Sequence, residues 1–222
     1  MTEFDAFSDL LHRRHSCRAF RPDPVPRATI EKILTAAGRA PSWSNVQPWQ
    51  VIVTSGAATD TFREALSAAL EGPARPDIAF PTAYSDAHLA RRREVGWQLY
   101  DAVGVVKGDR EGSARQTAQN FTFFGAPNVA LIHAPKELGT YGVLDCGAYL
   151  MAFTLAAEAL GIATVAQAAV AAYSPAIHQH FALPDDRMVV CGIAFGYRDD
   201  DHPANSFRSN RAGLDEIVDF RG

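Results

Sequence analysis

The spacing of apolar residues along the chain predicts both helices and short strands. Apolar positions three and four apart predict helices over residues 4–13 and 26–39, and Pro26 suits a first helical position. Short apolar runs predict strands over 49–55, 128–133, 162–166 and 188–195. Helices outnumber strands and the connections are unequal, which favours an α+β or mixed α/β arrangement around one small sheet.

The middle of the chain predicts further helices separated by irregular structure. We expect helices over 59–70, 86–107, 111–121 and 175–181. Thr59 or Asp60 is suited to cap the first of these helices. Residues 72–85 contain three prolines and predict an irregular segment, either a long surface loop, which is favoured, or a mobile cover over a site.

Residues 145–160 predict a helix with almost no polar face, ended by Gly161. Such a helix is expected to be buried nearly all round, and in a protein of this size that favours burial in a subunit interface. Only 12 uncharged residues separate Asp145 from Glu158, fewer than the roughly 20 apolar residues that a membrane span needs. A membrane protein is therefore not expected.

Composition narrows the class of protein. The chain has 222 residues, 47% apolar and 21% charged, which predicts one folded domain over 1–222. Its net charge of −4 disfavours a nucleic-acid binder, including an RNA-contacting face on Arg91–Arg93. Three distant cysteines without a CxxC pair, and no secretory signal, favour a cytoplasmic protein.

Standard catalytic motifs are missing, and a basic segment is the first positive signal. The chain has no GxSxG, HExxH, GxxxxGK[ST] or GxGxxG motif, and its paired histidines lack a third metal ligand. Residues 13–18 read RRHSCR. Guanidinium groups and a serine hydroxyl are suited to bind a phosphate. The alternative is a solvated basic helix end favoured by the helix dipole.

Three other segments carry candidate chemistry. Residues 41–49, PSWSNVQPW, form a proline-stiffened loop suited to cover an aromatic ring, or else a hydrophobic turn. In 163–170, small residues surround Gln167, which suits close ligand approach or a tightly packed strand end. Arg208 and Arg211 in the tail can complete a phosphate site, although two exposed arginines alone carry little information.

Together, the ordered segments resemble the nitroreductase family of flavin enzymes. The segments that carry the resemblance are RRHSCRAF, PSWSNVQPW, NFTFFGAPNVALI, GVLDCGAYLMAFTLAAEALGIATVAQAAVAAY, VVCGIAFGY and NSFRSNRAGLDE. The later segments are most similar to the bacterial subgroup that reduces nitrobenzoates and other nitroaromatics. The resemblance implies a homodimer with a small, mostly antiparallel sheet flanked by helices. It also implies a C-terminal tail over the partner and FMN sites lined by both subunits.

The resemblance also implies residue roles. The FMN phosphate, ribityl chain and ring edge are assigned to Arg14, His15, Ser16 and Arg18, with Arg208 and Arg211 on the phosphate. The loop reaching the flavin from the partner is assigned to Pro41, Ser42, Trp43, Asn45 and Gln47. The flavin N5 side is assigned to Gln167, Ala168 and Ala169, and the pyrimidine edge to Asn120 or Gln119.

The sequence departs from the family pattern in the run around Gln167, where relatives with a carboxylate would present a different polarity to the ring, and near flavin N1/O2. Many relatives have a lysine near flavin N1/O2 where Thr122 stands here, and either Arg115 or a backbone group is a replacement. Trp43, Phe123 and Phe124 are candidates for stacking on a flat substrate, with core packing the alternative for the two phenylalanines.

The implied activity is reduction of nitroaromatic, and also quinone, acceptors with NADH or NADPH. It proceeds by two-electron ping-pong hydride transfer through FMN, with no side chain required as acid or base. Other flavin chemistry, such as reductive dehalogenation or breakdown of the flavin, is an alternative. A flavin-binding protein without turnover is another.

Overall fold

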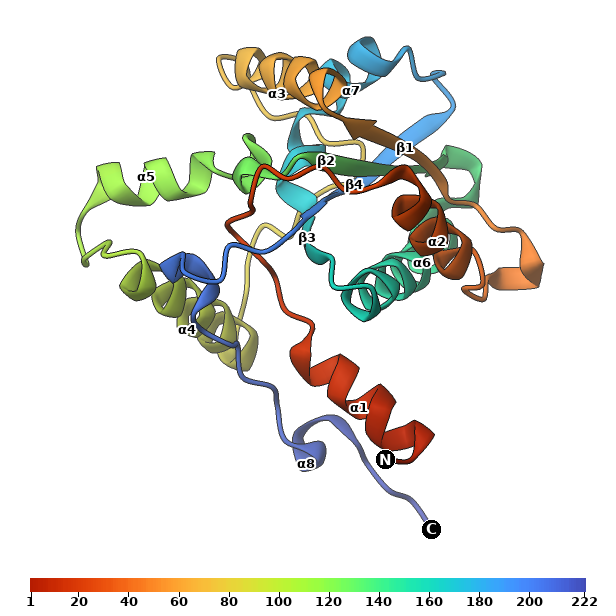
Figure 1. The fold of residues 1–222 in the computed structure, drawn as a ribbon, viewed down its shortest axis with the longest axis vertical. Helices are drawn as coiled ribbons and strands as arrows, with labels where there is room; N and C mark the ends of the chain where they lie inside the picture. The colour runs from red at the N-terminus through yellow and green to blue at the C-terminus, as the bar shows by residue number, and fades with distance from the viewer.

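The computed structural model describes residues 1–222 and contains one four-stranded sheet (Figure 1). Its strands are β1 (Gln50–Ser55), β2 (Asn128–Pro135), β3 (Ala163–Gln167) and β4 (Arg187–Gly196). They pair in the order β1-β2-β4-β3, and every pairing is antiparallel. The structure therefore confirms an α+β fold around a small antiparallel sheet.

Eight α-helices accompany the sheet. They are α1 (Glu3–Arg13), α2 (Arg27–Ala37), α3 (Ala57–Ala69), α4 (Asp86–Ala102), α5 (Arg110–Ala118), α6 (Gly139–Ala159), α7 (Ser174–Phe181) and α8 (Leu214–Ile217). All the predicted helices are present. However, α4 ends five residues before the predicted Lys107, since Gly104 has a positive φ of 73°.

Two helix starts differ from prediction. Helix α3 is capped by Gly56, which has a φ of 54°, so the prediction of a Thr59 or Asp60 cap is wrong. The Thr59 hydroxyl instead lies 3.1 Å from the Pro127 carbonyl oxygen. Helix α6 begins at Gly139, six residues before the predicted start. Its first turns carry two glycines, which are poor helix formers.

Helices cover both faces of the sheet and form two hydrophobic cores (Figure 1). On one face, α3 and α7 contribute Phe62, Leu66 and Ile177. On the other face, α2 and α6 contribute residues such as Ile33 and Phe153. Alternate residues of β2 enter alternate cores, so this strand is buried on both sides, which explains its continuous apolar sequence.

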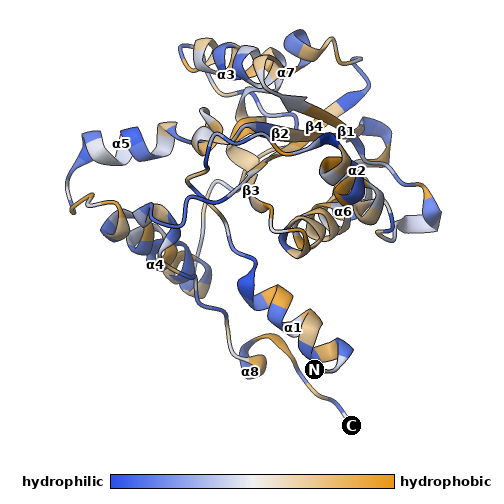
Figure 2. Ribbon diagram, in the orientation of Figure 1, coloured by the Kyte–Doolittle hydropathy of each residue, from blue (hydrophilic) through white to orange (hydrophobic).

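Helix α6 is buried on one face only, so the predicted all-round burial is wrong for the single chain. Its inner residues, including Tyr149 and Phe153, pack in the core. Tyr141, Leu144 and Met151 are 57%, 65% and 40% exposed, and Figure 2 shows an apolar helix. By length and composition alone this helix could cross a membrane. Its packing against the sheet and α2 is that of a core helix.

The irregular segment 72–85 is confirmed, and it is fastened to the sheet layer. The Arg75 N–H donates to the Ala172 carbonyl at 2.7 Å. The Asp77 carboxylate accepts from the Val189 N–H at 2.8 Å and lies 2.9 Å from His178 Nε2. These contacts favour the surface-loop interpretation over a mobile cover.

Helices α1 and α4 bury none of their residues and lie apart from the sheet (Figure 1). The C-terminal tail runs past α4, where Arg91 pairs with Glu216 at 2.8 Å. The tail therefore has a partner within its own chain. Its apolar side chains Leu214, Ile217 and Phe220 remain 62%, 66% and 82% exposed.

Candidate functional site

The basic segment 13–18 is held against the edge of the sheet. Ser16 bridges Thr164 in parallel, and the Cys17 N–H donates to the Thr164 carbonyl at 2.9 Å. The fully buried Cys17 side chain anchors the segment in the core. The side chains that flank Cys17 are consequently presented outward beside β3.

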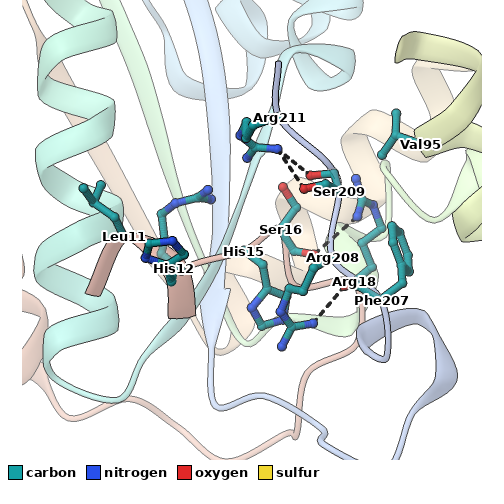
Figure 3. Close-up of a pocket in the computed structure, with 11 residues that line it drawn as sticks. Leu11, His12, His15, Ser16, Arg18, Val95, Phe207, Arg208, Ser209 and Arg211 are labelled. Atoms are coloured by element: carbon teal, nitrogen blue, oxygen red, sulfur yellow. Dashed lines mark hydrogen bonds between the residues drawn. The ribbon is translucent and has the colours of Figure 1, made fainter. Parts of the chain in front are cut away.

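The C-terminal tail closes a pocket over this segment (Figure 3). The pocket has a volume of about 340 Å³ and contains no carboxylate in its lining. Its polar lining comes from His12, Arg14, His15, Ser16, Arg18, Arg208, Ser209 and Arg211. The structure thus brings together, from segments far apart in the sequence, the four residues predicted for the phosphate, ribityl chain and ring edge and the two tail arginines predicted for the phosphate.

The lining of the pocket carries positive charge without a carboxylate, and Glu158, outside the lining, only partly offsets the effects that lower the pKa of Arg14. Arg14 Nε and His15 Nε2 are buried and have no hydrogen-bond partner. Burial lowers the pKa of Arg14, and the nearby Arg211 guanidinium lowers that pKa further. Burial also lowers the pKa of the Arg18 side chain. Buried cationic groups of this kind are stabilised by an anion that supplies both charge and acceptors.

His15 has a defined proton position. Its Nδ1 lies 2.9 Å from the Arg13 carbonyl, which only accepts, so Nδ1 carries the proton. Burial lowers the pKa of His15 despite this hydrogen bond, and the positive charge of Arg208 lowers it further. Neutral His15 therefore presents Nε2 as an acceptor, suited to a hydroxyl group of a bound molecule.

The amide of Gln167 lies on the same strand as the bridge partner of Ser16. Gln167 is 2% exposed, and its Nε2 donates to the Asn120 carbonyl at 2.8 Å. Its buried Oε1 has no partner. Three residues of strand, roughly 10 Å, separate Thr164 from Gln167. Ala168 and Ala169, which have only methyl side chains, follow at the start of a 3-10 helix. A phosphate-ended, elongated molecule with a polar-edged ring fits this donor set.

The tryptophan loop lies elsewhere in the chain. It packs beside α2 and α6, away from α4 and the tail (Figure 1). The Trp43 ring packs against Tyr141 in a tilted arrangement, with ring centroids 4.7 Å apart, and stays 61% exposed. The loop is tightly folded, because Ser44, Asn45 and Gln47 have positive φ angles of 46°, 59° and 48°. The Ser42 hydroxyl accepts from the Gln47 N–H at 3.0 Å. Pro41 and its neighbours therefore do not reach the pocket of their own chain.

The two predicted substrate-stacking phenylalanines lie in the core. Phe123 is fully buried against Phe62, with ring centroids 5.1 Å apart, and Phe124 is 7% exposed. Both take the packing role, because Arg63 fixes their turn. It donates to the carbonyls of Thr122 at 3.1 Å and Ala126 at 3.2 Å. Substrate stacking by this pair is not supported.

Arg115 does not take the place of the family's lysine. Its guanidinium pairs with Glu111 at 2.8 Å on the exposed side of α5. The backbone alternative at Thr122 remains, although the Thr122 carbonyl accepts from Arg63.

Sequence reasoning missed two polar residues next to the predicted segments. Asp145 is 7% exposed and accepts from the Trp43 N–H. An acidic residue inside an apolar helix was the available signal, because buried charges need partners. Asn205 is 5% exposed and contacts Arg18. Its position just before the basic tail offers no comparable signal.

Comparison with known proteins places the chain among flavin enzymes. A family model described as "Nitroreductase family" matches residues 11–197. Nitroreductase NfnB of Mycolicibacterium smegmatis is 36% identical over 214 residues, which cover 95% of this chain and 91% of the relative. The 4-nitrobenzoate reductase of Nocardioides sp. is 31% identical, covering 97% and 90% of the two chains.

Solved structures give the same result. The FMN-dependent nitroreductase NfnB from Mycobacterium smegmatis in complex with NADPH superposes with a TM-score of 0.95 at 35% identity, covering 100% of both chains. The FMN and NADPH-dependent NfnB from Sphigopyxis sp. strain HMH gives a TM-score of 0.93 at 34% identity, covering 97% and 98% of the two chains. On sequence, fold and motif order together, the chain belongs to the nitroreductase family.

Proposed function

We propose that this chain is an FMN-dependent oxidoreductase that uses NADH or NADPH to reduce nitroaromatic acceptors. The observation that carries the proposal is the carboxylate-free pocket in which buried, unpartnered Arg14 and His15 atoms face Arg208 and Arg211. Similar proteins described as FMN- and NADPH-dependent nitroreductases and as 4-nitrobenzoate reductases support it. Quinones belong to the same proposed acceptor range.

Different residues of the site would bind different parts of FMN. Arg14, Arg18, Arg208 and Arg211 would hold the phosphate, while Ser16 and the Nε2 acceptor of His15 suit the ribityl hydroxyls. Gln167 and the backbone of Ala168–Ala169 would meet the ring, with Asn120 behind Gln167. When bound, FMN supplies the two-electron chemistry that links the nicotinamide to the nitro group. The protein supplies orientation and a cationic environment.

We also propose that two copies of this chain form each site in a single-domain, cytoplasmic homodimer. The exposed apolar side of α6 and the exposed Trp43 ring support an interface, because such surface is costly to leave in water. In this arrangement the partner supplies Pro41, Ser42, Trp43, Asn45 and Gln47, and the apolar tail covers the neighbouring subunit. Light scattering is expected to give twice the chain mass of 24.0 kDa.

The half-reactions test the activity. Purified protein is expected to be yellow, to bleach anaerobically on adding NADH or NADPH, and to regain colour with 4-nitrobenzoate. Bound flavin that neither nicotinamide bleaches would instead indicate a flavin-binding protein without turnover. Bleached flavin that no nitroarene reoxidises would indicate other flavin chemistry, such as reductive dehalogenation. Either result would overturn the proposal.

A further inference from the structure

We propose that Asn205 is a positioning residue that sets the two halves of the phosphate pocket against each other. The inference rests on the proposed FMN site and assigns a role to a side chain outside the pocket lining. One half of the pocket follows α1 and contains Arg14 to Arg18. The other half lies in the tail and contains Arg208 and Arg211.

The Asn205 amide uses its hydrogen-bonding capacity on backbone groups. Its Oδ1 accepts from the Arg18 N–H at 2.7 Å. Its Nδ2 donates to the carbonyls of Ala19 at 2.9 Å and Asp199 at 2.8 Å. Acceptor and donors face opposite kinds of group, so only one orientation of the amide satisfies all three. Because Asn205 is only 5% exposed, water has little access to replace these hydrogen bonds.

Asn205 also sets the start of the tail. It ends a 3-10 turn, Pro203–Asn205, and its carbonyl accepts from Arg208 Nη1 at 2.9 Å. The bond from the Arg18 N–H to Asn205 Oδ1 links residues 14–18 directly to residues 203–211. It joins residues 187 positions apart. Backbone bonds from the Asp199 N–H to the Ala19 carbonyl at 3.1 Å and from the Arg21 N–H to the Tyr197 carbonyl at 2.8 Å hold the adjoining segments together. Asn205 extends this pairing to Arg18 and to the start of the tail, and so sets the separation between the two arginine groups.

This geometry predicts an effect confined to the phosphate. The ring end of the proposed site is built on β3 and Gln167, which Asn205 does not contact. Loss of the amide shifts Arg18 and Arg208 relative to each other and weakens bonds that only a phosphate makes. Riboflavin has the same ring and ribityl chain without the phosphate, so it reports on the remainder of the site.

The test compares FMN and riboflavin binding by flavin-free protein, measured through quenching of flavin fluorescence. In Asn205→Ala, the FMN dissociation constant is expected to rise about tenfold, equivalent to one lost charged hydrogen bond. The riboflavin constant is expected to stay within about twofold, on the same energy scale. Asn210→Ala is the matched control for general loosening of the tail, because the exposed Asn210 amide donates to Glu94 of α4 and lies outside the pocket lining.

Three outcomes decide the proposal. An unchanged FMN constant, or an equal loss for FMN and riboflavin, would overturn it, since the latter indicates a general structural role. If the alanine variant does not fold, the same ratio is measured in Asn205→Ser, which retains one donor and one acceptor. A wild-type protein that binds neither flavin would instead contradict the proposed function.

Discussion

The backbone N–H of Trp43 lies 3.1 Å from each carboxylate oxygen of Asp145. This contact ties the tryptophan loop to the middle of α6, and it is the reason that a buried acid is tolerated in an apolar helix. The loop is thereby held in a tight conformation, with its exposed Trp43 ring packed at a tilt against Tyr141. In the proposed homodimer, this conformation would present the loop to the partner subunit.

Removing this carboxylate is expected to destabilise the loop. Asp145→Ala leaves the Trp43 N–H without its acceptor, which costs about 1–3 kcal/mol of unfolding free energy. Asp145→Asn retains an acceptor and should lose less. Urea unfolding measures the free energy, and tryptophan fluorescence follows the Trp43 environment. Equal stability of wild type and the alanine variant would contradict the assigned role.

The arginines of the pocket are expected to strengthen FMN binding while lowering the stability of the flavin-free protein. Arg211 lowers the pKa of Arg14, so the two guanidinium groups repel each other. Arg211→Ala should weaken FMN binding about tenfold while leaving flavin-free stability unchanged or raised. Thermal melts and FMN titration measure the two effects. Arg39→Ala, at an exposed arginine outside the pocket, is the control. A lower melting temperature with unchanged FMN affinity would contradict this expectation.

The buried histidines predict a loss of stability in acid. Burial lowers the pKa values of His15 and His133 in the folded protein. An unfolded chain binds these protons near its ordinary pKa of about 6.5. As pH falls below that value, protons favour the unfolded state, so flavin-free stability should decrease from pH 7 to 5.5.

Urea unfolding at several pH values tests this linkage. His15→Gln should reduce the slope of stability against pH below about 6.5. The same slope in the His15 variant and the wild type would show that His15 does not resist protonation.

The three thiols are expected to be unreactive in the folded protein. Burial raises the pKa of Cys17 to about 11 and the pKa values of Cys146 and Cys191 to about 12. Thiolate is the reactive form, so a disulfide reagent at pH 8 should label none of them rapidly. Guanidinium chloride should release three thiols per chain. Rapid labelling of the native protein would contradict their burial.

Close packing at the end of β4 predicts a penalty for one methyl group. A Cβ at Gly196 would lie 2.7 Å from Pro127 Cδ, so Gly196→Ala should destabilise by about 1–3 kcal/mol. Gly96→Ala, where nothing lies within 4 Å inside α4, should instead stabilise by up to about 1 kcal/mol. Calorimetry of the two variants separates close packing from helix propensity, and equal effects would contradict the packing.

Periodicity predicted seven of the eight α-helices and all four strands, because apolar spacing reflects which face is buried. The short helix α8 in the tail was not predicted. Boundaries were less predictable. The start of α6 was predicted too late, because glycines in its first turns are poor helix formers. At Gly142 a Cβ would meet Leu138 at 2.8 Å, so close packing rather than helix propensity favours glycine there. Likewise, Gly56 caps α3 through a positive φ that no residue pattern announces.

The site was predictable in its chemistry but not in its assembly. Arg14 and Ser16 lie in a recognisable basic segment, whereas Arg208 joins them only through the path of the tail. Phe123 was a candidate for stacking on a flat substrate, with core packing as the alternative. Its burial depends on Phe62, which is distant in sequence and adjacent only in the fold.

The link between Arg18 and Asn205 has a consequence for biosynthesis. The two residues are 187 positions apart. The part of the pocket formed by residues 14–18 therefore cannot pair with the tail until nearly the whole chain has been synthesised. Contacts of this range form late, after local helices and the sheet have reduced the entropy of closing the loop. A ligand in this pocket can therefore stabilise only a chain whose tail has docked, and cofactor loading would distinguish finished from unfinished molecules.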